Sequence, residues 1–375
     1  MDSPIDPACG DGSDALVAAC TAGEVLAHGR YLDAATNRAL ARHLNSSAVG
    51  NKMNNTWALV LAAGEGSRLR ALTTHRGVAV PKQFCSLVGG PSLLEEAILR
   101  AEAIVPRQRV CTVVAEQHRV WWEEALRFMP RRNVIVQPQN RGTAVGLLLP
   151  LLHIAQRDPQ ARVVILPSDH YVRDEAVLAR SLRQAASRLA FDTKNLWLLG
   201  ISPEEADPEL GYIVPGNRDE AGALSVAQFV EKPPMTLARL MIERGGLWNA
   251  FILAGAVSAI LRLFYLRYPQ LLNDMRAAVH LDASSPDEAV AATDLYPRLP
   301  ELDFSRHVLE GSETALRVLP VPACGWSDLG TPRRCRPRPS IVPVRWVRSG
   351  SCRVGAPRAR LVRRLRRRAT RRGTR

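Results

Sequence analysis

The chain of 375 residues is long enough for one large hydrophobic core or two modest ones, and its formal net charge is +14. Residues 333–375 account for the whole positive excess, because they contain 17 arginines, no lysine and no acidic residue, which leaves 33 basic and 36 acidic side chains in the other 332 residues. The seven cysteines are odd in number and form no Cys-x-x-Cys pair, which argues against a disulfide scaffold or a cysteine zinc site and favours a reduced, cytoplasmic protein.

The first segment, residues 1–54, has some helical periodicity but no motif that indicates a function. We expect an N-terminal extension outside the core, which is either upstream sequence before a start at Met53 or a small helical appendage. Its acidic start lacks the apolar core of a signal peptide. The longest apolar stretch of the chain, near Gly146–Leu152, is too short to cross a bilayer, so we expect no membrane association.

Residues 55–332 alternate between segments of strand type and helix type, which favours an α/β fold with parallel strands. Strands are predicted at 57–62, 110–114, 133–137, 163–166 and 196–201. Helices are predicted at 91–103, 116–128, 143–156 and 174–189, the last of them capped by Asp174. Beyond Gly211 the pattern is mixed, with strands predicted at 224–231 and 315–319 and helices at 237–243 and 257–268.

A run of small residues follows the first predicted strand. In Ala62-Ala63-Gly64-Glu65-Gly66-Ser67-Arg68 the backbone N–H groups can approach an anion closely, and Arg68 and Lys82 add positive charge. The pattern lacks the Gly-Lys-Ser/Thr ending of a P-loop, and Leu69 stands where the dinucleotide fingerprint requires a small residue. We predict a phosphate-binding loop; the alternative is a glycine-rich turn beside a basic patch.

Two further polar stretches follow predicted strands. Gln137-Pro138-Gln139-Asn140-Arg141-Gly142 offers an amide and a tight backbone to the edge of a nucleobase, although an ordinary strand-to-helix loop would have the same residues. Asp169 ends an apolar strand, where α/β sheets bind ligands; the alternative is that it caps the next turn. His170, beside it, is of a type that more often packs or hydrogen-bonds than catalyses.

Three later stretches carry polar side chains. Glu231 and Lys232 are adjacent on an extended segment, so their side chains should diverge, one towards sugar hydroxyls and the other towards a phosphate. Asn249 adds an amide, and Asp328 adds a second lone carboxylate between small residues. Taken singly, these stretches are equally compatible with a solvated charge pair or a polar turn.

In this order, the motifs between Leu61 and Thr331 resemble those of the mannose-1-phosphate guanylyltransferases, within the sugar-1-phosphate nucleotidyltransferases. The resemblance implies a Rossmann-like α/β nucleotidyltransferase domain over residues 55–332, with a mixed, mostly parallel central sheet flanked by helices. It also implies an enzyme that transfers a guanylyl group from GTP to mannose-1-phosphate, giving GDP-mannose and pyrophosphate.

The resemblance also implies a role for each motif residue. The triphosphate would be wrapped by Ala62, Ala63, Gly64, Gly66, Ser67 and Arg68, and Lys82 would stabilise its charge. Gln137 and Gly142 would contact the base, and Asp169 and Asp328 would hold Mg²⁺. Gly211, Glu231 and Asn249 would bind the sugar, and Lys232 its phosphate. The implied catalytic residues are Arg68, Lys82 and Asp169.

Departures from the family pattern, such as Ala71, Val145, Gly146 and Ala250, remove none of these side chains. Pro150 lies inside a predicted helix, where proline costs about 3 kcal/mol, and this puts the alignment of the base site in doubt. The alternatives are a transferase for another sugar phosphate or base, or a nucleic-acid-binding protein that acts through the arginine tail.

The tail, residues 333–375, is predicted to be disordered, because its arginines repel one another and it lacks core residues. An arginine-only run is also what an out-of-frame reading of a GC-rich gene would give. If the tail is genuine, we expect only non-specific contact with nucleic acid. The sequence leaves a homodimer open.

Overall fold

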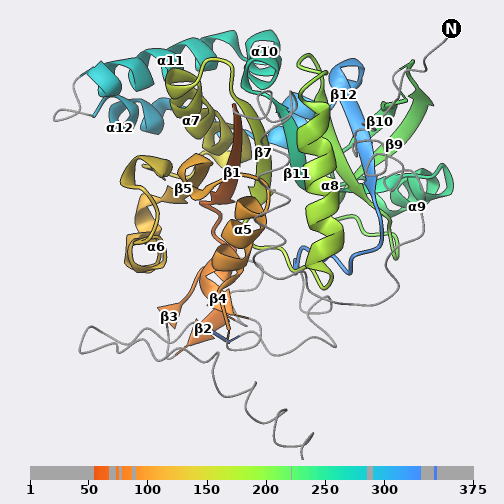
Figure 1. The fold of residues 1–375 in the computed structure, drawn as a ribbon, viewed down its shortest axis with the longest axis horizontal. Helices are drawn as coiled ribbons and strands as arrows, with labels where there is room; N and C mark the ends of the chain where they lie inside the picture. Colours follow the sequence, from red (N-terminus) through yellow and green to blue (C-terminus); the bar gives the residue numbers. More distant parts are fainter. Residues whose placement is uncertain are drawn as a thin grey trace, which may run out of the picture. The chain divides into compact units, whose positions relative to one another are not determined.

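The computed structural model describes residues 55–66, 73–75, 78–86, 90–220, 222–284, 290–330 and 342–343. Its centre is a nine-stranded sheet in the order β6-β5-β1-β7-β11-β8-β12-β10-β9 (Figure 1). These strands are β1 (Thr56–Ala62), β5 (Val110–Ala115), β6 (Val134–Gln137), β7 (Arg162–Pro167), β8 (Leu196–Ile201), β9 (Gly211–Arg218), β10 (Leu224–Val230), β11 (Leu247–Ala256) and β12 (Leu316–Val321). The predicted extension at 1–54 and all of the predicted tail except 342–343 lie outside the described residues and stay predictions.

Four short strands form two separate antiparallel pairs. β2 (Thr74–His75) pairs with β3 (Val78–Ala79), and β4 (Cys85–Ser86) pairs with β13 (Val342–Pro343). The second pair places two backbone residues of the tail beside the segment that follows Lys82.

The apolar run at the start of the core forms β1, which has a parallel neighbour on each side, β5 and β7. Ala58, Leu59 and Val60 are fully buried, as expected for a central strand covered by helices on both faces. The strands predicted at 57–62, 110–114 and 163–166 are therefore confirmed and lie side by side in one sheet.

The sheet is mixed, and the expectation that it is mostly parallel is wrong. β11 runs antiparallel to β7, β8 and β9, and β10 runs antiparallel to β9 and β12. β9 and β11 are not among the strands predicted from the sequence. β11 lacks a regular alternation because its pairing with β8 shifts register between Asn249 and Leu253, and Phe251 within that shift has φ 53°.

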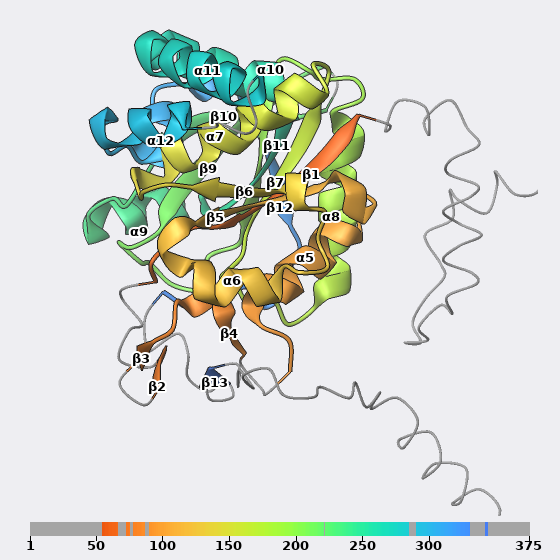
Figure 2. The ribbon, with the colours of Figure 1, turned by 90° about the vertical axis from the view of Figure 1, so that its left-hand side faces the viewer.

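Helices cover both faces of the sheet. On one face, α5 (Leu93–Glu102) and α8 (Glu175–Arg188) contact β7, and on the other α7 (Gly142–Arg157) contacts β5 and β6 while α10 (Val257–Arg267) contacts β11. Figure 2 shows α10, α11 (Pro269–Ser284) and α12 (Ala291–Leu295) gathered at the top, with α5 and α8 at the lower right. The remaining described α-helices are α6 (Arg119–Ala125) and α9 (Met235–Glu243).

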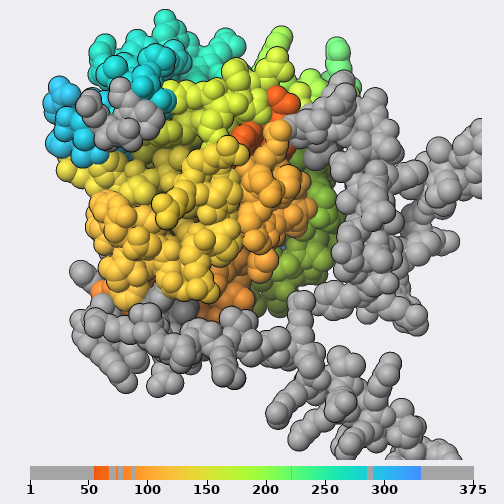
Figure 3. All heavy atoms as spheres, turned by 60° about the vertical axis from the view of Figure 1, so that its left-hand side comes forward, coloured from red at the N-terminus to blue at the C-terminus, as the bar shows by residue number. Residues whose placement is uncertain are grey.

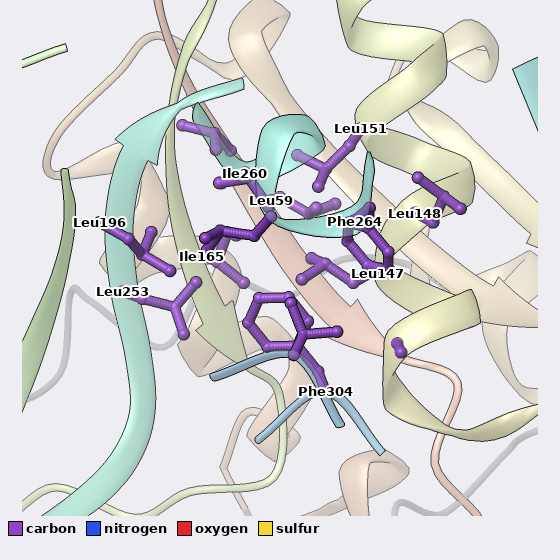
Figure 4. Packing of buried hydrophobic residues seen from close by; sticks show 14 of the residues in the cluster. Leu59, Leu147, Leu148, Leu151, Ile165, Leu196, Leu253, Ile260, Phe264 and Phe304 are labelled. Carbon is purple, nitrogen blue, oxygen red and sulfur yellow. The ribbon is translucent and has the colours of Figure 1, made fainter. Parts of the chain in front are cut away.

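The hydrophobic core lies between the sheet and the layer of α7, α10 and α11. In Figure 4, Leu59, Ile165 and Leu253 from the strands point towards side chains of α7, α10 and the segment at 304. Burial of apolar surface of this kind contributes about 25 cal/mol for each Å² removed from water. The core therefore fixes the positions of the strand ends that carry the predicted site residues.

Pro150 does not break α7, which is continuous from Gly142 to Arg157. Proline lacks the N–H that would bond to the carbonyl four residues earlier, at Gly146. Ten of the sixteen residues of α7, Pro150 among them, are buried, so packing against the sheet and α10 offsets the lost hydrogen bond.

Side-chain caps mark the starts of α5 and α8. The Ser92 hydroxyl accepts from the Glu95 amide at 3.2 Å, and the Glu95 carboxylate accepts from the Ser92 amide at 2.7 Å. Asp174 accepts from the Val177 amide at 3.2 Å, which confirms its predicted role as the cap of α8. None of the described helices is both long enough and apolar enough to cross a membrane.

Candidate active site

Lys82 contacts both aspartates that were predicted to hold a metal ion. Its ammonium group donates to Asp169 Oδ2 at 3.0 Å and to the main-chain carbonyl of Asp328. Lys82 is 4% exposed and lies on a short 3₁₀ turn, Lys82–Phe84, that follows Pro81. Two aspartates that follow different strands, β7 and β12, therefore meet the same buried cation.

The loop that follows β1 is held by a residue to which the sequence analysis gave no role. The Gln83 amide donates to the carbonyl of Ala62 at 3.1 Å and to that of Gly64 at 2.9 Å. Gln83 is 2% exposed, and its amide reaches across to the end of β1. Its position directly after Pro81 and Lys82 is the sequence signal that could have identified it.

The predicted phosphate loop is described as far as Gly66. Gly66 has φ 61°, and a Cβ on it would stand 3.0 Å from the Lys82 Cβ, so glycine suits this position for both reasons. Ala63 is half-buried and Gly64 is exposed, with open space where its Cβ would be. Ser67 and Arg68 lie outside the described residues, and their roles stay predictions.

The Asp169 carboxylate is accessible to solvent and is also bound by the Lys82 ammonium group. Its side chain is 38% exposed, so a ligand can reach it. Burial acts to raise the pKa of its carboxyl group, but Lys82, His170 and hydrogen bonds outweigh burial and lower that pKa. Asp169 is therefore an anion at neutral pH.

His170 is a neutral imidazole in this site. Burial, together with the charges of Lys82 and Arg100, lowers its pKa to about 4, although Asp169 acts in the opposite direction. Its Nδ1 accepts a hydrogen bond from Trp326 Nε1 at 3.2 Å. The packing role that the sequence favoured for His170 agrees with these contacts.

Asp328 lies in a tight turn and is 8% exposed. Its Oδ1 accepts from the Gly330 amide at 3.0 Å, and a Cβ on Gly330 would collide with the same carboxylate. Ser327 exchanges two backbone hydrogen bonds with Tyr171, each 2.9 Å long. This bridge joins the turn of Asp328 to the segment that follows Asp169.

The three residues predicted to bind the sugar are brought together. Gly211 on β9 pairs with Asn249 on β11, and Glu231 comes directly after β10. A Cβ on Gly211 would collide with Glu231 Oε2 and stand 3.1 Å from the Asn249 Cβ, so only glycine leaves this space open. Lys232 follows with φ 53° and is exposed, and the backbone turns sharply between Glu231 and Pro233.

Glu231 is an unusual carboxyl group. Burial and the nearby Asp303 raise its pKa to about 7, against the opposing effects of Lys232, Asn249 and Ser305. Its Oε2 is buried and has no hydrogen-bond partner in the protein. A buried acceptor of this kind is suited to a ligand that brings its own hydroxyl donors.

Two further residues of this cluster were not predicted from the sequence. The Asn249 amide donates to Ser305 Oγ at 3.2 Å, and the Glu231 amide donates to the Glu310 carboxylate. Both partners belong to the stretch around a short π-helix, Ser305–Leu309. Asp303-Phe304-Ser305 has no spacing that indicates a site, so the sequence offered no signal for them.

The predicted base-reading residues lie apart from Lys82, at the end of β6, which is two strands from β1 in the sheet. Gln137 is 1% exposed and its Oε1, which has no partner, points at α7, where a Cβ on Gly146 would stand 2.8 Å from it. Gly142 has φ 79° and packs against the Leu302 backbone, whose carbonyl accepts from the Ala144 amide at 2.9 Å. Contact with a base stays a prediction for both residues.

Two residues beside Lys82, Asp169 and Asp328, have side chains of the type that holds a magnesium ion. Mg²⁺ prefers hard oxygen ligands and is usually bound by one or two carboxylates together with substrate phosphates. Asp169 and Asp328 carry such oxygens. The Asp169 carboxylate binds the ammonium group of Lys82, whereas Asp328 binds it through its main-chain carbonyl. Within the part of the chain that the structure describes, no group of three or more His, Cys, Asp or Glu side chains is placed to hold a metal ion.

Comparison with known proteins identifies the family. A family profile described as nucleotidyl transferase matches residues 57–335. The chain belongs to the nucleotidyl transferase family. This finding confirms the predicted enzyme family and an α/β fold of that family's type.

This nucleotidyl transferase is similar to several curated relatives. It is 28% identical over 282 residues to the xanthan biosynthesis protein XanB of Xanthomonas campestris pv. campestris (strain B100), covering 74% of this chain and 58% of that protein. It is 29% identical over 286 residues to a mannose-1-phosphate guanylyltransferase of Escherichia coli (strain K12), covering 73% of this chain and 58% of that protein. The chain therefore spans 58% of the length of these relatives.

Solved structures also resemble this nucleotidyl transferase. A structure named mannose-1-phosphate geranyltransferase from Thermus thermophilus has a TM-score of 0.62 and 27% identity, covering 74% of this chain and 76% of that one. A structure named mannose-6-phosphate isomerase from Helicobacter pylori has a TM-score of 0.54 and 17% identity, covering 73% of this chain and 99% of that one. The second likeness shows the fold alone.

Proposed function

We propose that this nucleotidyl transferase transfers a guanylyl group from GTP to mannose-1-phosphate, giving GDP-mannose and pyrophosphate. One observation carries the proposal: Lys82, Asp169 and Asp328, from three separate motifs, meet at one ammonium group. The choice of sugar and base is supported by relatives named mannose-1-phosphate guanylyltransferase.

The reaction needs positioning and positive charge more than a general base. A phosphate oxygen of the sugar phosphate, already anionic near neutral pH, forms a bond to the α-phosphorus of the nucleotide. The bond from that phosphorus to the oxygen of the leaving pyrophosphate breaks, and the electron pair departs with it. In-line placement and fixed cations that face the growing negative charge are therefore the main contributions of the protein.

The residues around Lys82 have the roles that this chemistry requires. Lys82 faces the triphosphate with a charge that Asp169 already orients. The small residues Ala62, Ala63, Gly64 and Gly66 leave backbone N–H groups free to approach phosphate oxygens, and Ser67 and Arg68 continue that loop. Bound Mg²⁺, held by Asp169 and Asp328, would supply further neutralisation of the phosphate charge.

The second cluster would hold the acceptor sugar. Gly211, Glu231 and Asn249 form one polar surface in which Glu231 Oε2 is buried and unsatisfied, so sugar hydroxyls would complete its hydrogen bonds. Lys232 follows Glu231 directly and would meet the sugar phosphate. Gln137 and Gly142 would contact the base from the far side of β5. We also propose a cytoplasmic location for the enzyme.

The proposal is tested by pyrophosphate release from the full chain, with four nucleoside triphosphates crossed against several sugar-1-phosphates, with and without Mg²⁺. The expected result is strongest turnover with GTP and mannose-1-phosphate, and loss of turnover without the metal. A clear preference for another pairing would overturn the choice of substrates and leave the reaction class. Lack of turnover with every pairing would overturn the transferase function.

A further inference from the structure

An indole group connects the two aspartate segments. Trp326, two residues before Asp328, donates from Nε1 to His170 Nδ1 at 3.2 Å, and the two rings meet edge to face with centroids 5.2 Å apart. Trp326 is 5% exposed, so water does not compete for this hydrogen bond. An indole N–H only donates, which means that Nδ1 of His170 acts as the acceptor and carries no proton.

The proton of the neutral imidazole is therefore on Nε2, and Nε2 is the nitrogen that faces Asp169. It lies 3.8 Å from Asp169 Oδ1, while Lys82 binds the other carboxylate oxygen, Oδ2, at 3.0 Å. An N–H group thus lies on the side of each oxygen of the Asp169 carboxylate, within hydrogen-bond distance at Oδ2 and just beyond it at Oδ1. With the opposite tautomer, a lone pair would face Asp169 Oδ1, and a lone pair repels an anionic oxygen.

The backbone around His170 is fixed from a second direction. Arg100 on α5 donates to the His170 carbonyl at 3.2 Å and makes two bonds of 2.9 Å to Glu175, at the start of α8. Arg100 is 6% exposed. Figure 3 shows the surfaces of α5, in orange, and α8, in green, in contact at this side of the molecule. Because this backbone is fixed, the orientation of the His170 ring depends on Trp326.

We propose that Trp326 is a positioning residue: it holds His170 as the Nε2–H tautomer, and His170 in turn orients the Asp169 carboxylate between itself and Lys82. The tautomer follows from the hydrogen bonds alone, whereas its consequence for divalent-cation binding rests on the proposed function. Residues that orient a ligand of a metal typically change metal affinity or activity by about 10- to 100-fold when they are replaced.

The chain offers a matched control for the loss of an indole donor. Trp197 on β8 is 3% exposed, and its Nε1 donates to Asp192 Oδ2 at 3.1 Å. Trp326→Phe and Trp197→Phe therefore both remove one buried N–H and keep an aromatic ring. Only the first removes a hydrogen bond to His170, so a difference between the two variants separates positioning from general packing.

The experiment uses the full chain labelled with ¹⁵N-histidine, with the His170 signals assigned by their loss in His170→Gln. In the unaltered protein we expect a protonated Nε2 and an unprotonated Nδ1. In Trp326→Phe we expect the His170 ¹⁵N shifts to move, the dissociation constant for Mn²⁺ to rise by roughly 10-fold, and kcat to fall by a similar factor. Trp197→Phe should leave the His170 shifts and Mn²⁺ affinity unchanged.

Three results would overturn the inference: an Nδ1–H tautomer in the unaltered protein, unchanged His170 shifts in Trp326→Phe, or equal losses of Mn²⁺ affinity in both tryptophan variants. The spectrum of the unaltered protein decides the tautomer even if Trp326→Phe does not fold. Mn²⁺ binding by His170→Gln then decides whether the imidazole matters for the cation. A protein with the expected tautomer and no transferase activity would contradict the proposed function and not the assigned tautomer.

Discussion

The side-chain amide of Gln83 donates to the backbone carbonyl of Gly64 at 2.9 Å. This bond ties the loop after β1 to the turn that carries Lys82, so the predicted phosphate loop and its cation form one unit. Both groups are fixed before any anion arrives, which lowers the entropic cost of binding.

Replacing this amide should loosen the loop. Gln83→Met keeps the length of the side chain but leaves two carbonyls without a donor, at a cost of about 1–3 kcal/mol. We expect the KM for the nucleoside triphosphate to rise by about 10-fold in steady-state pyrophosphate release. Thermal unfolding should show only a modest fall in Tm. Gln184→Met, at an exposed position of α8, is the control. Equal effects of the two variants would contradict a role for Gln83 in holding the loop.

Loss of either aspartate charge should reduce turnover strongly. Asp169→Asn removes the charge of the carboxylate that binds Lys82, and Asp328→Asn removes the second carboxylate that is proposed to hold Mg²⁺. Lost electrostatic stabilisation of this kind costs roughly 10²-fold or more in kcat. Steady-state pyrophosphate release measures kcat for each variant, and thermal unfolding shows whether the variant is folded. Asp294→Asn, at an exposed position of α12, is the control and should leave kcat unchanged. Near-normal turnover in Asp169→Asn would mean that the cluster at Lys82 is not the reaction site.

Glu231 should make stability depend on pH. Its pKa is raised from 4.5 to about 7 in the folded protein, mainly by burial. Between these values the folded state keeps a proton that the unfolded state releases, so the free energy of unfolding falls as the pH rises from about 4.5 to 7 and levels off above that. Thermal unfolding across this range should show a smaller decline for Glu231→Gln than for the unaltered protein. The control Glu243→Gln, at an exposed position of α9, should show the same dependence of unfolding on pH as the unaltered protein. The raised pKa of Glu231 would be contradicted if Glu231→Gln also showed that same dependence.

Two glycines with nearly equal φ angles allow backbone strain to be distinguished from close packing. Gly142 has φ 79° and packs against the Leu302 backbone, whereas Gly222 has φ 75° and no atom within 4 Å of where its Cβ would be. A left-handed conformation costs alanine about 1–2 kcal/mol at either site, and Gly142→Ala must also displace backbone. Denaturant unfolding should therefore show a markedly larger loss for Gly142→Ala than for Gly222→Ala. Equal losses would mean that the Leu302 segment gives way readily.

The ends of the chain should be dispensable for turnover. A chain spanning Met53–Arg334 keeps every proposed site residue and loses 15 of the tail's 17 positive charges along with β13. It should fold, keep the activity of the full chain and lose salt-sensitive adsorption to nucleic acid. Tm and pyrophosphate release are compared for both chains at one salt concentration. Loss of folding would show that the tail packs on the core, and loss of activity alone would place the tail in the site.

The sequence predicted those parts of the fold that follow from local periodicity. Continuous apolar runs predicted the strands β1, β5, β7 and β8, and a single side chain, Asp174, predicted the helix cap. Both signals are local in the sequence. β11 was missed because the bulge around Phe251 interrupts its pattern, and without β11 the sheet would be mostly parallel. Strand direction depends on pairing between distant segments, which no local pattern encodes.

The same limit applies to the site. Lys82, Asp169 and Asp328 stand in motifs and could be named from the sequence. Ser305 and Glu310 could not, because they reach Asn249 and Glu231 only through the path of the chain around the π-helix. Residues that act only through tertiary contacts do not form a recognisable sequence motif, so the sequence alone does not identify them.

Lys82 and its acceptor in Asp328 are 246 residues apart, one of the largest separations among the described side-chain hydrogen bonds. A ribosome that makes this chain from the amino end completes β1, the Gln83 bonds and β7 long before it reaches β12, and domains generally begin folding during synthesis. Contacts of such high contact order close late, after the intervening loop entropy has been overcome. The Lys82 ammonium group therefore lacks its second partner during most of translation. A truncated messenger RNA that ends before the codon of Asp328 would yield a chain whose earlier strands can pair but whose reaction centre cannot assemble.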